Sequence, residues 1–366
     1  MISFQPTDEQ KMLVDSIRRY SEADVRKVAH EADEQDHAPD SVIGKGWELG
    51  LLPGLIPEAY GGYADEQPAV TGVLALEELA WGDLGIALKV WAPANFALAV
   101  LLAGTEAQKE EYLPLFCDID RPHMTVGLIE PHPLFDPWRP KTQAVVQGDK
   151  VTLSGEKAYV PMADGAEKLI IFASDSETGK VDGYIVESGS AGLEVGEREK
   201  LMGVKALPVY RIKLNDVAVP LVNRLGGEAG TNFPVILNRS RIALGAMGVG
   251  VARASLEYSV EYAKGRIQFG VPIATKQAIA FRIAKVAIEV DAARMLVWEA
   301  AWQADQGKEL TALAAQVKAQ VNKMVMFATD SGVQILGGYG YIREYPVERW
   351  LRHARGIATF DGLALV

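Results

Sequence analysis

Two short motifs in the C-terminal part of the chain carry residues suited to binding a diphosphate. The first reads Arg266-Ile-Gln-Phe-Gly270; it follows a long run of helical spacing and precedes Pro272. An arginine at such a corner can donate two parallel, charge-assisted hydrogen bonds to a diphosphate. Taken alone, the motif is also typical of an exposed arginine in a helix–helix turn.

The second motif, Gln334-Ile-Leu-Gly-Gly-Tyr-Gly-Tyr341, ends another long run of helical spacing. Its consecutive glycines, Gly337 and Gly338, would let a ligand approach the backbone closely because they carry no Cβ. A glycine-rich helix end is also an ordinary way to terminate a helix, so C-capping accounts for this motif when it stands alone.

Long helical patterns surround both motifs. Apolar residues recur at helical spacing over Phe233–Ala263, Lys276–Ala304 and Leu310–Leu336. Long helices with short connections predict a bundle. Alanine and glycine are dense between Ala243 and Ala252, which indicates close approach between helices.

The rest of the chain divides into a helical part and a β part. Helical spacing and caps predict helices at 9–29, 40–49, 68–80, 84–103 and 107–116. Short runs with period two predict strands at 145–146, 150–153, 169–173, 183–186, 193–195 and 210–214. We therefore expect an α+β protein, with an N-terminal helical domain (1–120), a middle antiparallel, barrel-like β domain (121–222) and a C-terminal four-helix bundle (223–366).

Composition and charge exclude several classes of function. The 366 residues include 37 Lys and Arg against 48 Asp and Glu, which gives a net charge of −11 without any basic cluster. Nucleic-acid binding needs a basic face, so we expect no nucleic-acid partner. His123, His132 and His353 are too scattered for a metal site, and we expect no metal.

The termini and the single cysteine indicate a cellular compartment. Cys117 has no second cysteine to pair with, which fits a reducing cytoplasm. The first nine residues carry acids where a signal peptide carries bases. The longest uncharged run of the N-terminal half, Val90–Thr105, is shorter than the roughly 20 residues that a membrane helix needs. We expect a cytoplasmic protein without membrane insertion.

Together, the motifs resemble those of the acyl-CoA dehydrogenase family. The resemblance is carried by Tyr262-Ala-Lys-Gly-Arg-Ile-Gln-Phe-Gly-Val-Pro-Ile273, Gln277-Ala-Ile-Ala-Phe281 and Gln334–Tyr341, in an order of helices, β domain and helices. Tyr60-Gly-Gly62 and Val217-Ala-Val-Pro220 extend it over nearly the whole chain.

The resemblance implies an FAD-dependent enzyme that desaturates acyl-CoA thioesters between the α and β carbons. A carboxylate removes the α proton, the β hydrogen leaves as hydride to the flavin, and the electrons pass to an electron-transfer flavoprotein. In oligomers of this family both motifs reach the FAD of a neighbouring subunit. The cofactor-binding residues implied here, matched residue by residue, are Arg266, Gln268, Phe269, Gln277, Gln334, Gly337 and Gly338.

The segments that hold a subunit's own flavin in this family are altered here. The first usually reads Thr-Glu-Pro-Gly-x-Gly-Ser-Asp; here Ile129-Glu-Pro-His-Pro-Leu-Phe-Asp136 has lost both hydroxyls and both glycines. The second usually reads Lys-x-Trp-Ile-Thr-Asn; here it is Lys157-Ala-Tyr-Val-Pro-Met162, and Pro161 also lacks an N–H. Each lost hydroxyl would leave a buried flavin acceptor unpaired, at about 1–3 kcal/mol.

The segment that carries the family's catalytic glutamate is altered too. It usually reads Tyr-Glu-Gly-Thr, and here it is Phe360-Asp-Gly-Leu363, which makes Asp361 the candidate base. A base must lie within roughly 2.6–3.2 Å of its proton, so the shorter side chain matters. Some branches place the base on the helix after the β domain, where Ser240 stands here. Arg241 matches the family's substrate-supporting arginine; a surface arginine is the alternative.

These observations leave three interpretations. The chain is one subunit of a hetero-oligomeric (α2β2) acyl-CoA dehydrogenase and contributes its Arg266 and Gln334 motifs to FAD held by a second subunit. Alternatively, it is a homotetrameric enzyme with Asp361 as base. A non-catalytic assembly subunit is the third, although such a subunit would not need these motifs. Trp91 is predicted either at the end of the family's acyl pocket or simply in the core.

Overall fold

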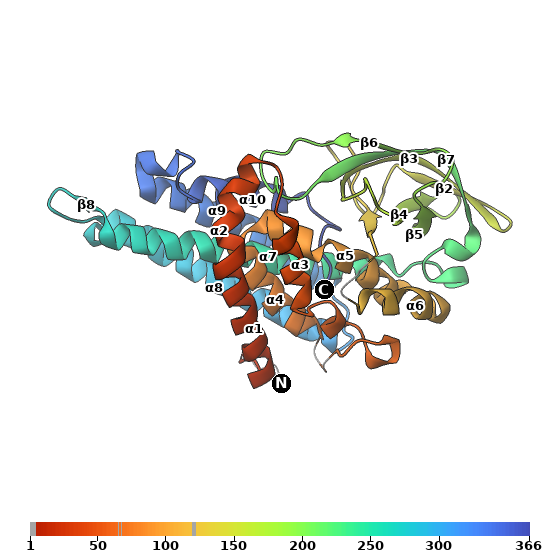
Figure 1. Ribbon diagram of the computed structural model, residues 1–366, viewed down its shortest axis with the longest axis horizontal. Helices are drawn as coiled ribbons and strands as arrows, with labels where there is room; N and C mark the ends of the chain where they lie inside the picture. The colour runs from red at the N-terminus through yellow and green to blue at the C-terminus, as the bar shows by residue number, and fades with distance from the viewer. Residues whose placement is uncertain (1–4, 65, 67, 119–121) are drawn as a thin grey trace.

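Helices fill the N-terminal part of the chain, as the sequence predicts (Figure 1). The computed structural model describes residues 5–64, 66, 68–118 and 122–366. The first helix begins behind a capping box in which Thr7 and Gln10 each accept the other's backbone N–H. The helices here are α1 (Asp8–Tyr20), which runs through a π-helical turn (Ser21–Val25) into α2 (Arg26–Glu34), then α3 (Asp40–Glu48), α4 (Pro68–Gly82), α5 (Leu84–Ala103) and α6 (Glu106–Tyr112).

A curled sheet follows, at one end of the helices (Figure 1). Its path runs β1-β4-β2-β3-β7-β6, with β5 on β4. Most ladders are antiparallel as predicted, but β4 pairs in parallel with both β1 and β2. The strands are β1 (Met124–Gly127), β2 (Gln143–Gln147), β3 (Lys150–Pro161), β4 (Lys168–Asp175), β5 (Val181–Glu187), β6 (Leu193–Arg198) and β7 (Val209–Pro220).

The C-terminal part returns to helices; the sequence predicts the ends of the three long ones to within two residues and does not predict the fourth. They are α7 (Phe233–Gly265), α8 (Gln277–Asp305), α9 (Thr311–Leu336) and a shorter α10 (Val347–Ile357). The far ends of α7, α8 and α9 project beyond the N-terminal helices (Figure 1). The α+β arrangement of helices, curled sheet and helices is confirmed.

Buried charges join α4 to the C-terminal helices. Arg253 lies 2.6 Å from Glu77 and 2.7 Å from Glu78, and Arg294 lies 3.1 Å from Glu77. Burial raises the pKa of Glu77 although both arginines oppose that shift. Charges this deep are costly unless paired, so the network fixes one arrangement of α4, α7 and α8.

Two helices, α5 and α7, are long and apolar enough to cross a membrane. Within the fold, 89% of the most apolar window of α5 and 83% of that of α7 is buried. Their apolar residues therefore pack in the protein core.

Candidate functional site

Arg266 lies at the start of a two-stranded hairpin between α7 and α8. The strands β8 (Ile267–Gln268) and β9 (Val271–Pro272) pair, and the turn residues Phe269 and Gly270 have φ angles of 56° and 77°. Positive φ at both central residues matches the twist of a hairpin but is unusual for phenylalanine. The turn leaves the Phe269 side chain 93% exposed.

The second motif forms the end of α9. Gly337 has φ 62° and ψ −130°, a conformation that residues other than glycine rarely adopt. No atom lies within 4 Å of a Cβ built on Gly337 or Gly338, and both glycines are exposed. The backbone at this turn is therefore open to a ligand.

The hairpin and this turn line one cavity of about 580 Å³. The guanidinium carbon of Arg266 lies 5.1 Å from the centroid of the Tyr339 ring, a cation–π distance. The cavity's two charged lining residues, Arg266 and Lys276, are both cations, which suits an anion. Gln268, Phe269, Gly337 and Gly338 also line it.

The polar side chains of this site make no hydrogen bond or ion pair inside the described part of the chain. No hydrogen bond or ion pair there uses the side chain of Arg266, Gln268, Gln277 or Gln334. The structure places Gln277 at the start of α8 and Gln334 in the last turn of α9, both exposed and outside the cavity lining. It thus gathers five of the seven predicted cofactor residues around one cavity.

A second cavity, of about 500 Å³, lies where the β domain meets the C-terminal helices. It brings together the first altered segment, Tyr159 from the second and Asp361 from the third. Arg241 also lines it, so this side chain is not the surface arginine that was the alternative. The three altered segments therefore meet in one place, as the resemblance implies.

The loop after β1 offers few backbone donors to this cavity. The N–H groups of His132, Leu134 and Phe135 already bond within the loop, to acceptors on Glu130 and His132. Pro131, Pro133 and Pro137 have no N–H at all. The loop therefore presents prolines and ring carbons rather than N–H groups to a diphosphate. The cations of this cavity, Arg211, Arg241 and Lys318, come from other elements and are each paired with a carboxylate, Glu199 or Asp361.

Polar groups of the second altered segment are also bonded within the protein. Tyr159 takes a φ of 52°, and its N–H donates to Oε2 of Glu199 over 3.1 Å. Lys157 is wholly buried, and its Nζ lies 2.9 Å from Oε1 of Glu130. Burial lowers the pKa of Lys157 to about 8, even though Glu130 opposes that shift. This ion pair, which no spacing in the sequence predicts, fastens the loop to β3.

Asp361 is 4% exposed and paired with two cations. Its Oδ2 lies 2.6 Å from Nζ of Lys318 on α9 and 3.6 Å from a guanidinium nitrogen of Arg241. The next residue, Gly362, donates its N–H to Oγ of Ser240 over 2.7 Å. Ser240, at the position where some branches carry the base, therefore holds the segment of Asp361 in place.

A buried histidine, His353, orients α10; in the sequence it is considered only as a metal ligand. The Nδ1 of His353 accepts the N–H of Val204, so its other nitrogen carries the proton and faces Oδ2 of Asp83 at 3.1 Å. Arg349 lies 3.2 Å from the same oxygen. Burial would raise the pKa of Asp83, but His353 and Arg349 outweigh it and bring the pKa to about 2.

Models of three domains of one family match this chain in order. Residues 7–120 match the acyl-CoA dehydrogenase N-terminal domain, residues 125–217 the middle domain and residues 233–364 the C-terminal domain.

Known proteins match over nearly the full length. The short-chain-specific acyl-CoA dehydrogenase of Megasphaera elsdenii is 34% identical over 373 residues, which cover 99% of this chain and 96% of that protein. The structure of butyryl-CoA dehydrogenase from Megasphaera elsdenii superposes with a TM-score of 0.89 at 33% identity, covering 99% and 96% of the two chains. A structure described as the electron transferring flavoprotein of Acidaminococcus fermentans gives 0.89 at 32% identity, with the same coverage.

Proposed function

The chain belongs to the acyl-CoA dehydrogenase family, and we propose that it is the subunit of an α2β2 member that contributes FAD-binding residues to a catalytic partner. The family binds FAD, and the relatives are named as oxidoreductases of this type, which act on CH–CH groups. The reaction proposed for the assembly is α,β-desaturation of an acyl-CoA thioester, in which FAD supplies the hydride acceptor.

The two cavities differ in the donors that they offer to a diphosphate, and this difference supports the proposal most directly. In the cavity of Arg266, the cationic and amide side chains have no hydrogen-bond or ion-pair partner in the described part of the chain, and the glycine backbone is open. In the cavity of Asp361, the loop N–H groups are already bonded or replaced by proline. The residues present fit FAD at the first cavity and do not fit its diphosphate at the second.

Each residue of the first cavity has a distinct part in holding the cofactor. Arg266 would donate paired N–H groups to the diphosphate, since a guanidinium matches two phosphate oxygens at once. Gln268 would add amide donors, and the Gly337 and Gly338 backbone would lie against the cofactor. Phe269 would cover its apolar surface. Gln277 and Gln334 flank the same region and are proposed as further donors.

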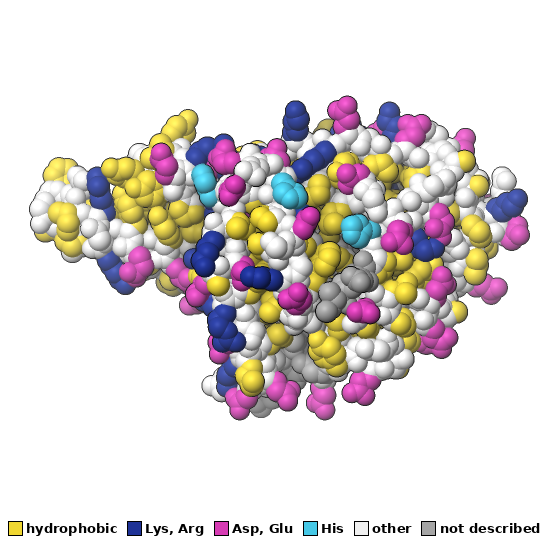
Figure 2. All heavy atoms as spheres, viewed as in Figure 1, with side chains coloured by type: hydrophobic (Ala, Val, Ile, Leu, Met, Phe, Trp, Pro, Cys, Tyr) yellow, Lys and Arg dark blue, Asp and Glu magenta, His cyan; other side chains and the backbone are white. Residues whose placement is uncertain are grey.

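Exposed apolar side chains near this cavity indicate that a second chain covers it. Figure 2 shows hydrophobic side chains gathered on the projecting end of the molecule. Phe269 is 93% exposed, Tyr341 87%, Ile288 69% and Phe281 65%. An apolar patch of this kind on a projecting arm marks a protein interface.

Asp361 supports a second candidate function. Its Oδ1 is buried with no hydrogen-bond partner in the described structure, and it borders the 500 Å³ cavity. A carboxylate oxygen in that state could accept a proton, as the homotetrameric interpretation requires. The pairing of its other oxygen with Lys318 and Arg241 favours the contributing role, because the carboxylate is already engaged by two cations.

The remaining partners belong to the same proposal. An acyl-CoA thioester is the proposed substrate of the assembly. Arg241, which the resemblance matches to the substrate-supporting arginine, is paired with Asp361 in this chain. An electron-transfer flavoprotein would accept the electrons. The cytoplasm is the proposed location.

The absorption spectrum of the purified protein tests the proposal. Expressed alone, the chain should purify without the flavin bands; co-expressed with a second acyl-CoA dehydrogenase subunit that has the intact Thr-Glu-Pro-Gly and Tyr-Glu-Gly-Thr segments, it should give one FAD per heterodimer. A homogeneous, fully flavinated homotetramer of this chain would overturn it.

A further inference from the structure

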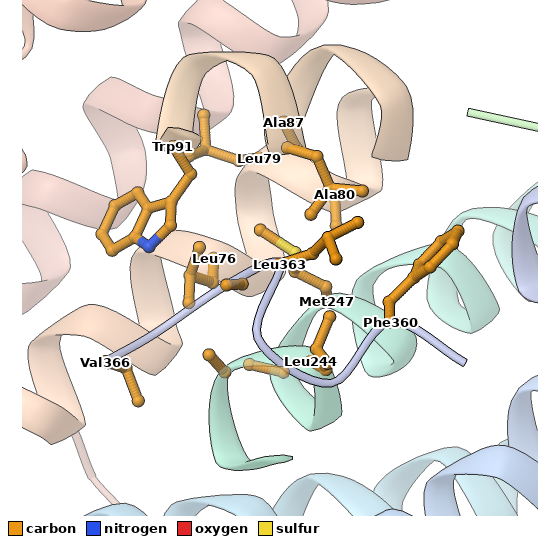
Figure 3. Packing of buried hydrophobic residues seen from close by; sticks show 14 of the residues in the cluster. Leu76, Leu79, Ala80, Ala87, Trp91, Leu244, Met247, Phe360, Leu363 and Val366 are labelled. Atoms are coloured by element: carbon orange, nitrogen blue, oxygen red, sulfur yellow. The ribbon is translucent and has the colours of Figure 1, made fainter. Parts of the chain in front are cut away.

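The segment Leu363–Val366 runs inside the helical core rather than over the surface. Leu363 is 4% exposed, Ala364 and Leu365 are fully buried, and Val366 is 2% exposed. Figure 3 shows the segment crossing between α4, α5 and α7, with Leu363 and Val366 among side chains of those three helices. An irregular segment this deep must satisfy its backbone groups by other means.

Two side chains of α5 bind the backbone of this segment. Asn95 donates from Nδ2 to the carbonyl of Leu363 over 2.7 Å, and Trp91 donates from Nε1 to the carbonyl of Leu365 over 2.8 Å. Residues four apart share one face of a helix, and alternate carbonyls of an extended segment point the same way. Trp91 and Asn95, on one face of α5, are therefore spaced to reach every second carbonyl of the segment.

The wall opposite α5 is shaped to receive the end of the segment. A Cβ on Gly72 of α4 would overlap Cγ2 of Val366. Only a residue without a side chain leaves this room. Gly72 is an interior helix residue, where glycine otherwise costs about 1 kcal/mol relative to alanine.

The segment separates two cavities. At its start, Asp361 borders the 500 Å³ cavity that also contains Arg241. At its end, Trp91 and Gly72 border an apolar cavity of about 150 Å³ against α1. The four residues span at most about 13 Å when extended. A thioester with its α carbon beside Asp361 would reach the cavity of Trp91 and Gly72 if its alkyl chain followed the apolar path of this segment.

We propose that Leu363–Val366 fills the acyl channel of this subunit, so that the subunit takes no acyl group of its own and acyl-CoA binds only at the partner. The segment supplies the apolar contacts that an alkyl chain would make, and Trp91 and Asn95 recognise its backbone. This inference rests on the proposed function for the identity of the ligand class. In this proposal both alternatives for Trp91 hold at once: it is a core residue, and it lies at the end of the channel.

Calorimetric titration of the purified assembly with octanoyl-CoA tests this assignment. With the full chain, we expect no site attributable to this subunit. With the chain shortened to residues 1–362, we expect one additional site per copy and no additional site for CoA without an acyl group. A shortened chain that assembles but gains no site would overturn the proposal, as would a full chain that already binds one octanoyl-CoA per copy.

A second variant covers the case in which the shortened chain does not fold. Trp91→Phe with Asn95→Leu removes both donors and keeps the wall apolar. We expect faster amide exchange in residues 363–366 and a gained octanoyl-CoA site. Trp47→Phe is the matched control, because Trp47 also donates its indole N–H to a carbonyl of α5, that of Val90, away from the segment.

Failure of this inference can be distinguished from failure of the proposed function. Exchange that stays at the level of the Trp47→Phe control, or faster exchange without a gained site, would contradict the inference. Flavin content does not enter either result. A flavinated homotetramer would therefore overturn the proposed function while the acyl-CoA count still decides the role of Leu363–Val366.

Discussion

Lys318 on α9 places its Nζ 2.6 Å from Oδ2 of Asp361, and the carboxylate is 6% exposed. The same oxygen faces Arg241 at 3.6 Å. Asp361, the candidate base, therefore binds two cations from two helices, α9 and α7. The pairing gives Asp361 a structural role whether or not it touches substrate.

Asp361→Asn tests which role dominates. We expect the free energy of unfolding to fall by about 1–3 kcal/mol, because Lys318 and Arg241 lose their carboxylate. Urea denaturation would measure this. Asp136→Asn, on an exposed loop, is the control and should change stability little. Substrate should still reduce the flavin of the co-expressed assembly; complete loss of flavin reduction would instead identify Asp361 as the base of a homotetramer.

Arg266→Ala should lower the FAD affinity of the assembly. A charge-assisted pair of bonds contributes about 1.5–3 kcal/mol, so we expect roughly 10- to 100-fold weaker binding. Fluorescence titration of the flavin-depleted assembly with FAD would measure it. Arg139→Ala removes an exposed arginine from the β domain and should bind FAD normally. Equal affinity of the two variants would favour a non-catalytic assembly subunit.

The lowered pKa of Asp83 predicts how the free energy of unfolding depends on pH. Its pKa is about 2 in the folded chain, against about 3.9 for an unfolded aspartate. A carboxyl with a lowered folded pKa stabilises the protein fully above the unfolded pKa, and this contribution disappears as pH falls towards 2. The shift corresponds to about 2–3 kcal/mol.

Asp83→Asn should therefore lose most stability at neutral pH and differ less from the native chain near pH 2. Unfolding free energies measured across pH 2–7 would show the convergence. Asp149→Asn, in an exposed turn, should run parallel to the native chain. Parallel curves for Asp83→Asn as well would show that the contacts of Asp83 with His353 and Arg349 do not depend on its charge.

Local sequence signals predict most of the fold. Of the candidate site, they predict the cavity of Arg266 and Gly337 but not the packing around Asp361. The long C-terminal helices have strong periodicity, so their ends were predictable. β1 has no alternation because all four of its residues are buried, and it was missed. The hairpin at Arg266 and the turn at Gly337 are local features. Their roles in binding FAD stay predictions until the flavin measurements are made.

Long-range packing explains what the sequence could not give. Leu363–Val366 is a short apolar run with no periodicity, and its path depends on Gly72 and Trp91, far away in the chain. The Glu130–Lys157 pair likewise joins residues that only the register of β3 brings together. Neither relationship leaves a mark in the spacing of residues along the chain.

Gly72 and Val366 give a pairwise test of that packing. Gly72→Ala should destabilise the chain by about 1–3 kcal/mol, because the added methyl overlaps Val366 in a closed core. Gly44→Ala is the matched control: no atom lies within 4 Å of a Cβ there, so better helix propensity should stabilise α3 by roughly 0.5–1 kcal/mol. Val366→Ala should cost about 0.5–3 kcal/mol on its own through lost apolar contacts.

The double variant Gly72→Ala with Val366→Ala separates overlap from a general weakness of α4. Removing the two methyls of Val366 makes room for the one added at residue 72, so the double variant should be more stable than the sum of the single changes by about 0.5–3 kcal/mol. Thermal and urea unfolding of the four proteins would give the coupling energy. A coupling near zero would mean that Val366 does not lie against Gly72 in solution.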